Sequence, residues 1–195
     1  NIYYFMNEFL RAQENYEKAL SIYKKENHNI GIASCISNLG LVCQMLNNLE
    51  RALEYQIEGL KIEEKAKNTR GIAISHVSIS SVLLDMKRYD EAKKHALLSI
   101  NYSKSISDTN EISDGMLRLA DCYRLTGHHD SAQFYLKEVI RNCDKIKNLR
   151  LLAYTLDIQT QLYDSIGLYH DAFLSQKRLM AAKDSLLNKE ITAQL

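Results

Sequence analysis

The stretch NLGLVCQMLNNLERA, residues 38 to 52, decides the fold because its pattern returns along the whole chain. Its small residue, Gly40, stands twelve positions before an alanine, Ala52. The alanine recurs every forty positions, at Ala12, Ala52, Ala92, Ala132 and Ala172, and the small residue recurs at Gly40, Ser80, Ala120 and Thr160. A fixed period of this length is typical of a solenoid, in which each unit buries its apolar face against its neighbours.

Each unit reads as two amphipathic helices joined by a short turn. In the first half of residues 30–69, apolar side chains follow one another at spacings of three and four, as on one helix face. They are Ile32, Ile36, Leu39, Val42, Cys43 and Leu46. Asn47 and Asn48 then end the pattern, and Gly127 and Gly167 stand at the equivalent place. Asparagine or glycine there favours a left-handed helix end, so a second, antiparallel helix is expected to follow.

The predicted fold is all-α, a superhelical solenoid of antiparallel helix pairs with about nine helices. We expect a single domain over residues 1–195, without proline to break its helices. Residues 1–29 form a partial first unit, in which 8–26 are a second helix and 1–7 the remnant of its partner. Full units follow at 30–69, 70–109, 110–149 and 150–189, and residues 190–195 begin a C-terminal helical extension. The chain starts without methionine, so we expect it to be a piece of a longer protein.

Composition excludes several classes of function. Charged residues make up 25% of the chain and hydrophobic ones 46%, with a net charge of +1. Because acidic and basic residues are interspersed, no dedicated nucleic-acid surface is expected. No apolar run reaches the length of a membrane span, and no signal peptide is visible.

The spacing of these residues resembles the tetratricopeptide repeat. The segments that show the resemblance are NLG at 38–40 with Leu49 and Ala52, RYDEA at 88–92 and LYHDA at 168–172. The forty-residue period is longer than that of the basic form, roughly 34 residues, and the closing proline is missing. Both differences resemble the longer-helix subclass of kinesin light chains, bacterial peptide-pheromone receptors and bacterial signalling proteins. HEAT repeats have a similar period, but the register of small, aromatic and alanine residues favours the tetratricopeptide repeat.

This resemblance implies that an extended peptide or a partner helix binds the concave face formed by the first helix of each pair. Carried over by register, the face holds Ser34, Ser37, Asn38, Leu41, Gln44 and Met45, then Ile74, Val77, Ser78, Ser81 and Leu84, then Asp114, Leu117, Arg118, Asp121 and Arg124, and finally Tyr154, Asp157, Gln161 and Asp164. The first half is neutral and partly apolar, and the second carries both signs of charge. We expect a ligand with an apolar stretch and a charged stretch, and Tyr154 to touch it.

One family ligand is not expected. Some members hold a chaperone's C-terminal carboxylate with a clamp of lysine, asparagine and arginine. The clamp positions hold Ser37, Leu41, Val77 and Ser81 here. Chaperone-tail binding is therefore not predicted.

No residue pattern predicts catalysis, a metal or a cofactor. The four cysteines, at 35, 43, 122 and 143, form no C-x-x-C pair and read as buried small residues. His129 takes the place of Tyr89 and Tyr169, so a ring packed at a helix start is expected there rather than a metal ligand. His76 falls on a predicted core face. We expect no enzyme in this chain.

The C-terminal residues carry a second resemblance. Lys183-Asp184-Ser185-Leu186, followed by Asn188 and Glu190, is similar to the junction after the repeat array in membrane-tethered regulators of the Bacteroidetes group. There a coiled-coil helix and a membrane segment usually precede a histidine kinase of a two-component system or a helix-turn-helix DNA-binding domain. This resemblance implies signal transduction, with possible self-association through the C-terminal helix.

Three functions remain open at this point. The first is a sensory, protein- or peptide-binding segment of a larger bacterial signalling or transcription-regulating protein. The alternative is a free-standing cytosolic scaffold or adaptor, and the third choice is a peptide-pheromone receptor with a further N-terminal effector domain. The regulator resemblance implies the periplasmic side of the inner membrane, whereas four cysteines with no disulfide pattern favour a reducing compartment such as the cytoplasm.

Overall fold

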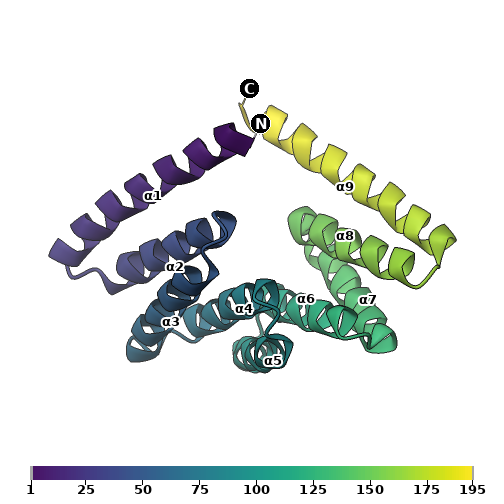
Figure 1. Cartoon of the computed structure of the whole chain (residues 1–195), viewed down its shortest axis with the longest axis horizontal. Coiled ribbons are helices and arrows are strands. Elements are labelled where there is room, and N and C mark those ends of the chain that lie inside the picture. Colours follow the sequence, from purple (N-terminus) through teal and green to yellow (C-terminus); the bar gives the residue numbers. More distant parts are fainter. Residues whose placement is uncertain (1, 195) are drawn as a thin grey trace. The chain divides into compact units, whose positions relative to one another are not determined.

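A computed structural model describes residues 2–194, with side chains described for 7–189, 191 and 192. This described part consists of nine α-helices, labelled in Figure 1, and contains no strand. They are α1 (Ile2–Lys25), α2 (Asn29–Met45), α3 (Leu49–Lys65), α4 (Thr69–Asp85), α5 (Tyr89–Ser105), α6 (Thr109–Leu125), α7 (His129–Ile146), α8 (Leu149–Ser165) and α9 (Tyr169–Gln194). The even-numbered helices start at regular forty-residue steps, and so do α3, α5, α7 and α9. The predicted all-α fold of sequential antiparallel helix pairs is confirmed.

The prediction for the N-terminal segment was wrong. A break between residues 7 and 8 was expected, but α1 runs without interruption from Ile2 to Lys25. The segment holds no glycine or proline, so no residue in it interrupts a helix. At the other end, α9 continues past residue 189 and reaches Gln194 as one helix.

A left-handed residue closes each helix that is followed by another, and it recurs at every twentieth position. The eight positions are Asn27, Asn47, Lys67, Lys87, Ser107, Gly127, Lys147 and Gly167, with φ between 53° and 78°. The next amide returns to a carbonyl five residues earlier, as in the 2.8 Å bond from Asn48 N to Cys43 O. This is the bonding of a Schellman motif, which satisfies the last carbonyls of the helix. The expected role of Gly127 and Gly167 is confirmed.

Polar residues cap the helix starts. The side chain of Asn68 accepts a hydrogen bond from Gly71 N at 3.2 Å, and that of Asn148 accepts one from Leu151 N at 3.0 Å. Asp108 caps α6 in the same way. Because these side chains satisfy amides that lack a helical partner, the polar joints between units fix where each first helix begins.

The chain divides into two compact units, and each is described by itself. Unit 1 is Asn1–Ile106, with helices α1 to α5, and unit 2 is Ser107–Leu195, with α6 to α9. Within each unit every helix packs on the next, and successive first helices also touch, α2 against α4 and α6 against α8. The division leaves the expected single domain as a prediction.

The alanines and small residues that recur every forty positions lie where the helices approach most closely. Ala52, Ala92 and Ala132 are all 0% exposed. A side chain added to Gly40 in α2 would come within 2.6 Å of the amide nitrogen of Gln56 in α3. Unit 2 builds its core from the same positions, with Leu117, Ala120, Ala132 and Leu136 in one buried cluster. Small residues therefore stand where a larger one would push the helix pair apart.

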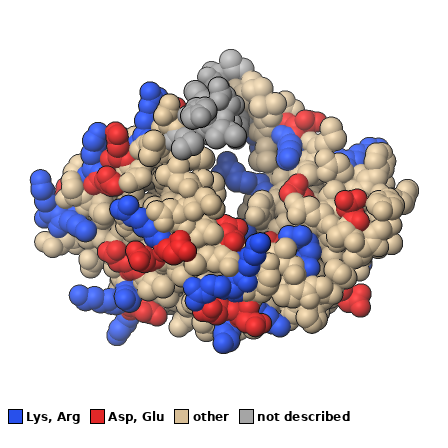
Figure 2. Space-filling model, viewed as in Figure 1, with Lys and Arg blue, Asp and Glu red and all other residues tan. Residues whose placement is uncertain are grey.

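None of the helices in the described residues is long and apolar enough to cross a membrane. Acidic and basic side chains intermingle on the face shown in Figure 2. The charge pattern expected from the sequence is thus present on that face, without a large area of one sign.

Candidate ligand-binding faces

In unit 1 the first helices α2 and α4 present a largely uncharged face. Leu41 and Met45 on α2 are 48% and 51% exposed, and Ile74 on α4 is 40% exposed. Gln44 links the two helices, because its side-chain nitrogen donates to Ser81 Oγ at 3.2 Å and to Asp85 Oδ2 at 2.6 Å. The face therefore combines apolar surface with a hydrogen-bonded amide. Ser34 is exposed, and the remaining predicted positions, Ser37, Asn38, Val77 and Ser78, are partly buried or exposed along the same face.

A small hollow lies between α2 and α4, and we call it the unit 1 seam. Its volume is about 240 Å³, and it is lined by Ser34, Ser37, Asn38, Glu63, Gly71, Ile74 and Ser75. Glu63, its one acidic residue, accepts a 2.7 Å hydrogen bond from the side-chain nitrogen of Asn68. Hydroxyl and amide groups thus dominate the lining.

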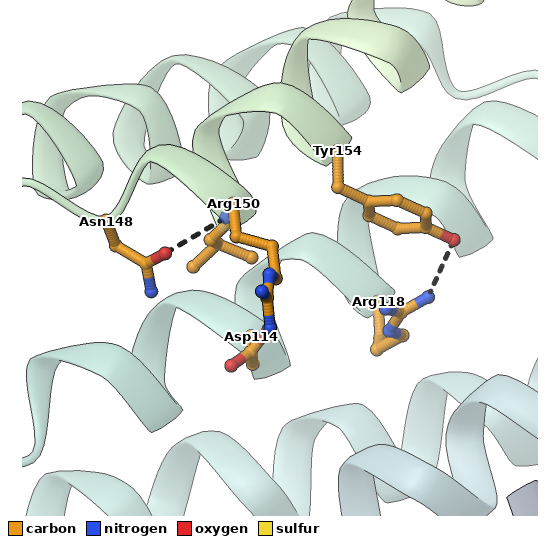
Figure 3. A pocket seen from close by; sticks show the side chains of 6 residues that line it. Asp114, Arg118, Asn148, Arg150 and Tyr154 are labelled. Carbon is orange, nitrogen blue, oxygen red and sulfur yellow. Dashed lines mark hydrogen bonds between the residues drawn. The ribbon is translucent and has the colours of Figure 1, made fainter. Parts of the chain in front are cut away.

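In unit 2 the first helices α6 and α8 present a charged face. Arg118 on α6 reaches Tyr154 on α8, with its Nη1 donating to the phenol oxygen at 3.3 Å and its Cζ 5.0 Å from the ring centre. Figure 3 shows the two side chains meeting at one end of the site. Tyr154 is 47% exposed, so its ring keeps a free surface beside the guanidinium.

Arg124 and Asp121 form an ion pair on the same face. Arg124 donates from Nε to Asp121 Oδ1 at 2.8 Å, and its Nη2 lies 2.7 Å from the same oxygen. The two side chains are only 18% and 14% exposed. Gln161 likewise donates to Asp157 at 2.9 Å, while Asp164 is exposed. Arg118 and Tyr154 are therefore better placed to meet a ligand than Arg124.

Between α6 and α8 lies the unit 2 seam, with a volume of about 280 Å³. It is lined by Asp114, Arg118, Asn148, Arg150, Leu151 and Tyr154. In Figure 3 the Arg150 side chain reaches from α8 toward Asp114 on α6. Burial raises the pKa of the Asp114 carboxyl, and the charge of Arg118 works against that rise. The Nε atom of Arg118 is buried and has no hydrogen-bond partner among the described residues.

Two residues expected on the face lie in the interior instead. Leu84 is 6% exposed and Leu117 is 0% exposed. Leu117 belongs to the core cluster of unit 2, with Leu136 and Leu162. Each residue of a helix turns the chain by about 100°, so a run of inward positions taken by register also includes neighbours that point into the helix pair.

The sequence reasoning missed the rim of the unit 2 seam. Asn148, Arg150 and Leu151 belong to the joint and first turn of α8, where the sequence pattern predicts only a cap. A signal is present, because Arg70 and Arg150 are equivalent in the repeat, as are Asn68 and Asn148. Extending the register from the helices to the joints would have found them.

Residues considered for chemistry have structural surroundings. His76 is 5% exposed, as predicted for a core histidine, and its Nδ1 lies 3.0 Å from that of His95. All four cysteines are buried thiols, and burial raises the pKa of the Cys143 thiol to about 12. His129 begins α7 and is partly buried. Among the described residues, no group of three or more histidine, cysteine, aspartate or glutamate side chains is arranged to hold a metal ion.

Other tyrosines differ in how far they are buried. Tyr163 is buried, and its hydroxyl accepts a 3.1 Å hydrogen bond from Gln133. Tyr123 stacks on Tyr135 with ring centres 5.8 Å apart. Tyr169, the first residue of α9, is 71% exposed.

The consecutive helix pairs, with successive first helices in contact inside each unit, define a helical-repeat protein. A tetratricopeptide repeat family model matches residues 1–65 and 71–145. The chain belongs to the tetratricopeptide repeat family. Repeats of this family are protein-interaction modules, so the coarse function predicted from the sequence is confirmed.

The chain is similar to several known proteins. Protein kinesin light chain-related 3 of Arabidopsis thaliana is 28% identical over 137 residues, which are 68% of this chain and 21% of that protein. The structure of aspartyl phosphate phosphatase F from Bacillus subtilis is similar with a TM-score of 0.77 at 16% identity, over 94% of this chain and 49% of that one. A Rap protein complexed with competence and sporulation factor is similar with a TM-score of 0.68 at 16% identity, over 96% and 62%.

At these identities the two solved structures show the fold alone. The chain spans about a fifth of the length of its kinesin light chain relative, 21%. What those whole proteins do is therefore a matter for proposal.

Proposed function

We propose that the chain is a protein- or peptide-binding module whose ligand contacts the first helices, α2, α4, α6 and α8. The observation that carries the proposal is the half-exposed Tyr154 beside Arg118, which forms the wall of an open seam on α6 and α8. A rigid aromatic ring beside a guanidinium offers both apolar area and charge at a low entropic cost. Exposed Leu41, Met45 and Ile74 add apolar surface on the corresponding face of unit 1.

We further propose that this module is the sensory segment of a larger bacterial signalling or transcription-regulating protein. The unbroken α9, 26 residues long, supports this role because a continuous helix can pass a change in the array to whatever follows it. The residues at 183–190 that resemble the junction of membrane-tethered regulators lie on that helix. The likeness to a Rap protein complexed with competence and sporulation factor supports a ligand-binding array of this fold.

Self-association through α9 is part of this proposal. Its exposed apolar side chains include Phe173, Met180 and Leu187, at 65%, 60% and 56%. A scaffold or adaptor remains the alternative and a peptide-pheromone receptor the third choice. Sequencing the parent gene past Leu195 separates them, because an apolar run of about 20 residues followed by kinase or helix-turn-helix motifs supports the sensor. A stop codon soon after Leu195 contradicts it and favours the adaptor.

The binding role is tested by selecting random peptides, displayed on phage, against the whole chain. Hydrogen–deuterium exchange with and without a selected peptide then locates the contact. We expect protection in α2, α4, α6 or α8 and none confined to α3, α5 or α7. Failure to enrich any peptide, or protection restricted to the second helices, contradicts the proposed function.

A further inference from the structure

A pair of histidines joins the two helices α4 and α5. The Nδ1 atom of His76 lies 3.0 Å from that of His95, and the ring centres are 5.1 Å apart. His76 is buried and His95 is partly buried. Tyr102, two turns after His95, stacks on the His76 ring with centres 5.7 Å apart. The two imidazoles are thus held with their Nδ1 atoms facing each other.

The repeat shows that packing alone does not require histidine at either place. The other three helix pairs have no imidazole at these two repeat positions. The equivalent residues are Ile36 and Tyr55, Met116 and Tyr135, and Leu156 and Ser175. A buried polar pair gains little net free energy over apolar packing, and departures from the packing pattern of a fold are expected at functional sites. The change of both positions to histidine in one pair therefore points to a function.

The geometry of the pair suits two nitrogens that bind one ion. Nitrogens 3.0 Å apart can share only one proton, so at least one Nδ1 presents a lone pair to the other. When the shared proton moves to Nε2 of its own ring, both Nδ1 lone pairs face the space between the rings. Both rings stay neutral, which is the form in which histidine binds metals.

The distance between the nitrogens selects among metal ions. Two metal–nitrogen bonds of about 2.0 Å that span 3.0 Å enclose nearly a right angle. Square-planar and tetragonal ions, Cu²⁺ and Ni²⁺, bind neighbouring ligands at such an angle. Zn²⁺ prefers the wider angle of a tetrahedron.

A buried hydroxyl beside the pair lacks a hydrogen-bond partner. Ser99, one turn after His95 on α5, is 0% exposed, and its Oγ has no partner among the described residues. In the preceding helix pair, a Cβ atom on the equivalent Gly59 would lie 3.8 Å from Ile36, which stands at the position of His76. The Ser99 side chain therefore lies beside the His76 ring. Since buried polar groups are nearly always hydrogen-bonded, a water molecule carried by an ion at the pair would satisfy this hydroxyl.

We propose that His76 and His95 form a two-histidine site for a divalent transition-metal ion, Cu²⁺ or Ni²⁺, bound by the two Nδ1 atoms with water in its remaining positions. Mg²⁺ and Ca²⁺ are not ligands of this site, because they take oxygen donors. The ion ties α4 to α5 and so stabilises unit 1. The site lies inside a helix pair, and it does not rest on the proposed function.

Titration of the whole chain with NiCl₂ tests the site, in protein prepared without a histidine tag. Ni²⁺ is paramagnetic, so a bound ion broadens the signals of nearby nuclei in the ¹⁵N-labelled chain. We expect the first amide signals to disappear around residue 76 in α4 and residue 95 in α5. MgCl₂ at the same concentration is the control and leaves these signals unchanged. First broadening elsewhere, such as around His128 and His129, overturns the proposal.

Three variants separate the pair from the other histidines, and each copies a residue that another unit has at the same place. They are His76→Leu, His95→Tyr and the matched control His129→Tyr. The first two should each lower the affinity for Ni²⁺, measured by isothermal titration calorimetry, by about tenfold or more, since one of two protein ligands is lost. The control should leave the affinity unchanged. Equal affinities of His95→Tyr and His129→Tyr contradict the assignment.

Thermal unfolding gives an independent readout. An ion that binds only the folded chain raises its Tm. Saturating Ni²⁺ should raise the Tm of the unsubstituted chain and of His129→Tyr by about 2 °C or more, and should leave that of His76→Leu unchanged. An unchanged Tm of the unsubstituted chain, or an equal rise in His76→Leu, overturns the proposal.

Discussion

The hydroxyl group of Ser80 donates a 2.8 Å hydrogen bond to the main-chain carbonyl oxygen of Ala92. Both residues are 0% exposed, and they join α4 to α5, the two helices of one pair. They are also the small residue and the alanine of the repeat register, twelve positions apart. The register therefore marks the points at which two helix backbones come closest, and at which side-chain volume is limited.

Replacing Ser80 with leucine is expected to lower the free energy of unfolding by about 3 kcal/mol, since overpacking forces the helices apart. Ser80→Ala should cost only about 1 kcal/mol, the worth of the hydrogen bond. Urea unfolding followed by circular dichroism measures both. Ser34→Leu, at an exposed first-helix position, is the control and should stay within about 0.5 kcal/mol. Equal stability of Ser80→Leu and Ser34→Leu would contradict the close approach.

Replacing the lysines that have a left-handed backbone conformation is expected to raise stability rather than lower it. Lys67 and Lys87 have φ of 53° and 59° and are exposed, a conformation that costs an ordinary residue about 1 kcal/mol or more and glycine little. Lys67→Gly and Lys87→Gly should therefore each stabilise the chain by about 1 kcal/mol. Lys61→Gly, in the interior of α3, should destabilise it by about 1 kcal/mol. Thermal unfolding compares the three, and destabilisation by Lys87→Gly would show that the turn is not as described.

The histidine pair makes stability depend on pH. Burial, and then the neighbouring His95, lower the pKa of His76 to about 4, and burial lowers that of His95 against the pull of Glu91. Since the folded values lie below the unfolded one, about 6.5, the unfolded chain takes up protons first as the pH falls. Stability should be fully present above about pH 6.5 and be lost as the pH falls toward about 4, by at most about 3 kcal/mol for His76.

The repeat supplies the replacement that tests this dependence. Leu156 stands at the position of His76 in a later unit and is 0% exposed. His76→Leu should therefore flatten the loss of stability between about pH 6.5 and about 4, as measured by urea unfolding at a series of pH values. An unchanged slope would mean that other groups carry the pH dependence.

The thiols should be inert in the folded chain. All four cysteines are buried, and burial raises the pKa of Cys35, Cys43 and Cys143. Since the thiolate is the reacting form, a disulfide reagent such as DTNB should modify none of them in buffer within minutes, and all four in urea. Rapid reaction of one thiol in buffer would contradict its described burial.

Some features of the fold could be predicted from the sequence and others could not. Gly40, Ser80 and the alanines predicted the helix pairs and their period, because close packing of backbones excludes every large side chain. The left-handed positions were visible only at asparagine and glycine. Lys67 and Lys87 carry no such signal, since the Schellman hydrogen bonds outweigh their backbone preference.

The candidate site was predicted less completely than the fold. Register placed Asp114, Arg118 and Tyr154 on one face, and the structure brings them together in the unit 2 seam. It could not show that Arg124 is paired with Asp121, because the pairing depends on side-chain rotamers. Nor did it separate Arg118, which is partly buried on that face, from Leu117, which is one residue away and fully buried.

The pairing of Arg124 changes what its substitution should do. Arg124→Glu places two carboxylates together on a partly buried surface, so it should lower stability rather than weaken ligand binding. A loss of about 2 kcal/mol is expected. Urea unfolding and peptide titration of the same variant distinguish the two effects. Undiminished stability with lost binding would assign Arg124 to the ligand face instead.

The most direct test of ligand binding by the first helices is the affinity of a library-selected peptide for two arginine variants. Arg118→Glu reverses a charge on α6, and Arg141→Glu reverses one on the second helix α7, where Arg141 is 61% exposed and paired with Glu138. Fluorescence anisotropy of the labelled peptide should show affinity falling by about tenfold or more for Arg118→Glu and unchanged for Arg141→Glu. Equal affinity for both variants, or a loss confined to Arg141→Glu, would contradict the assignment of the ligand to the first-helix faces.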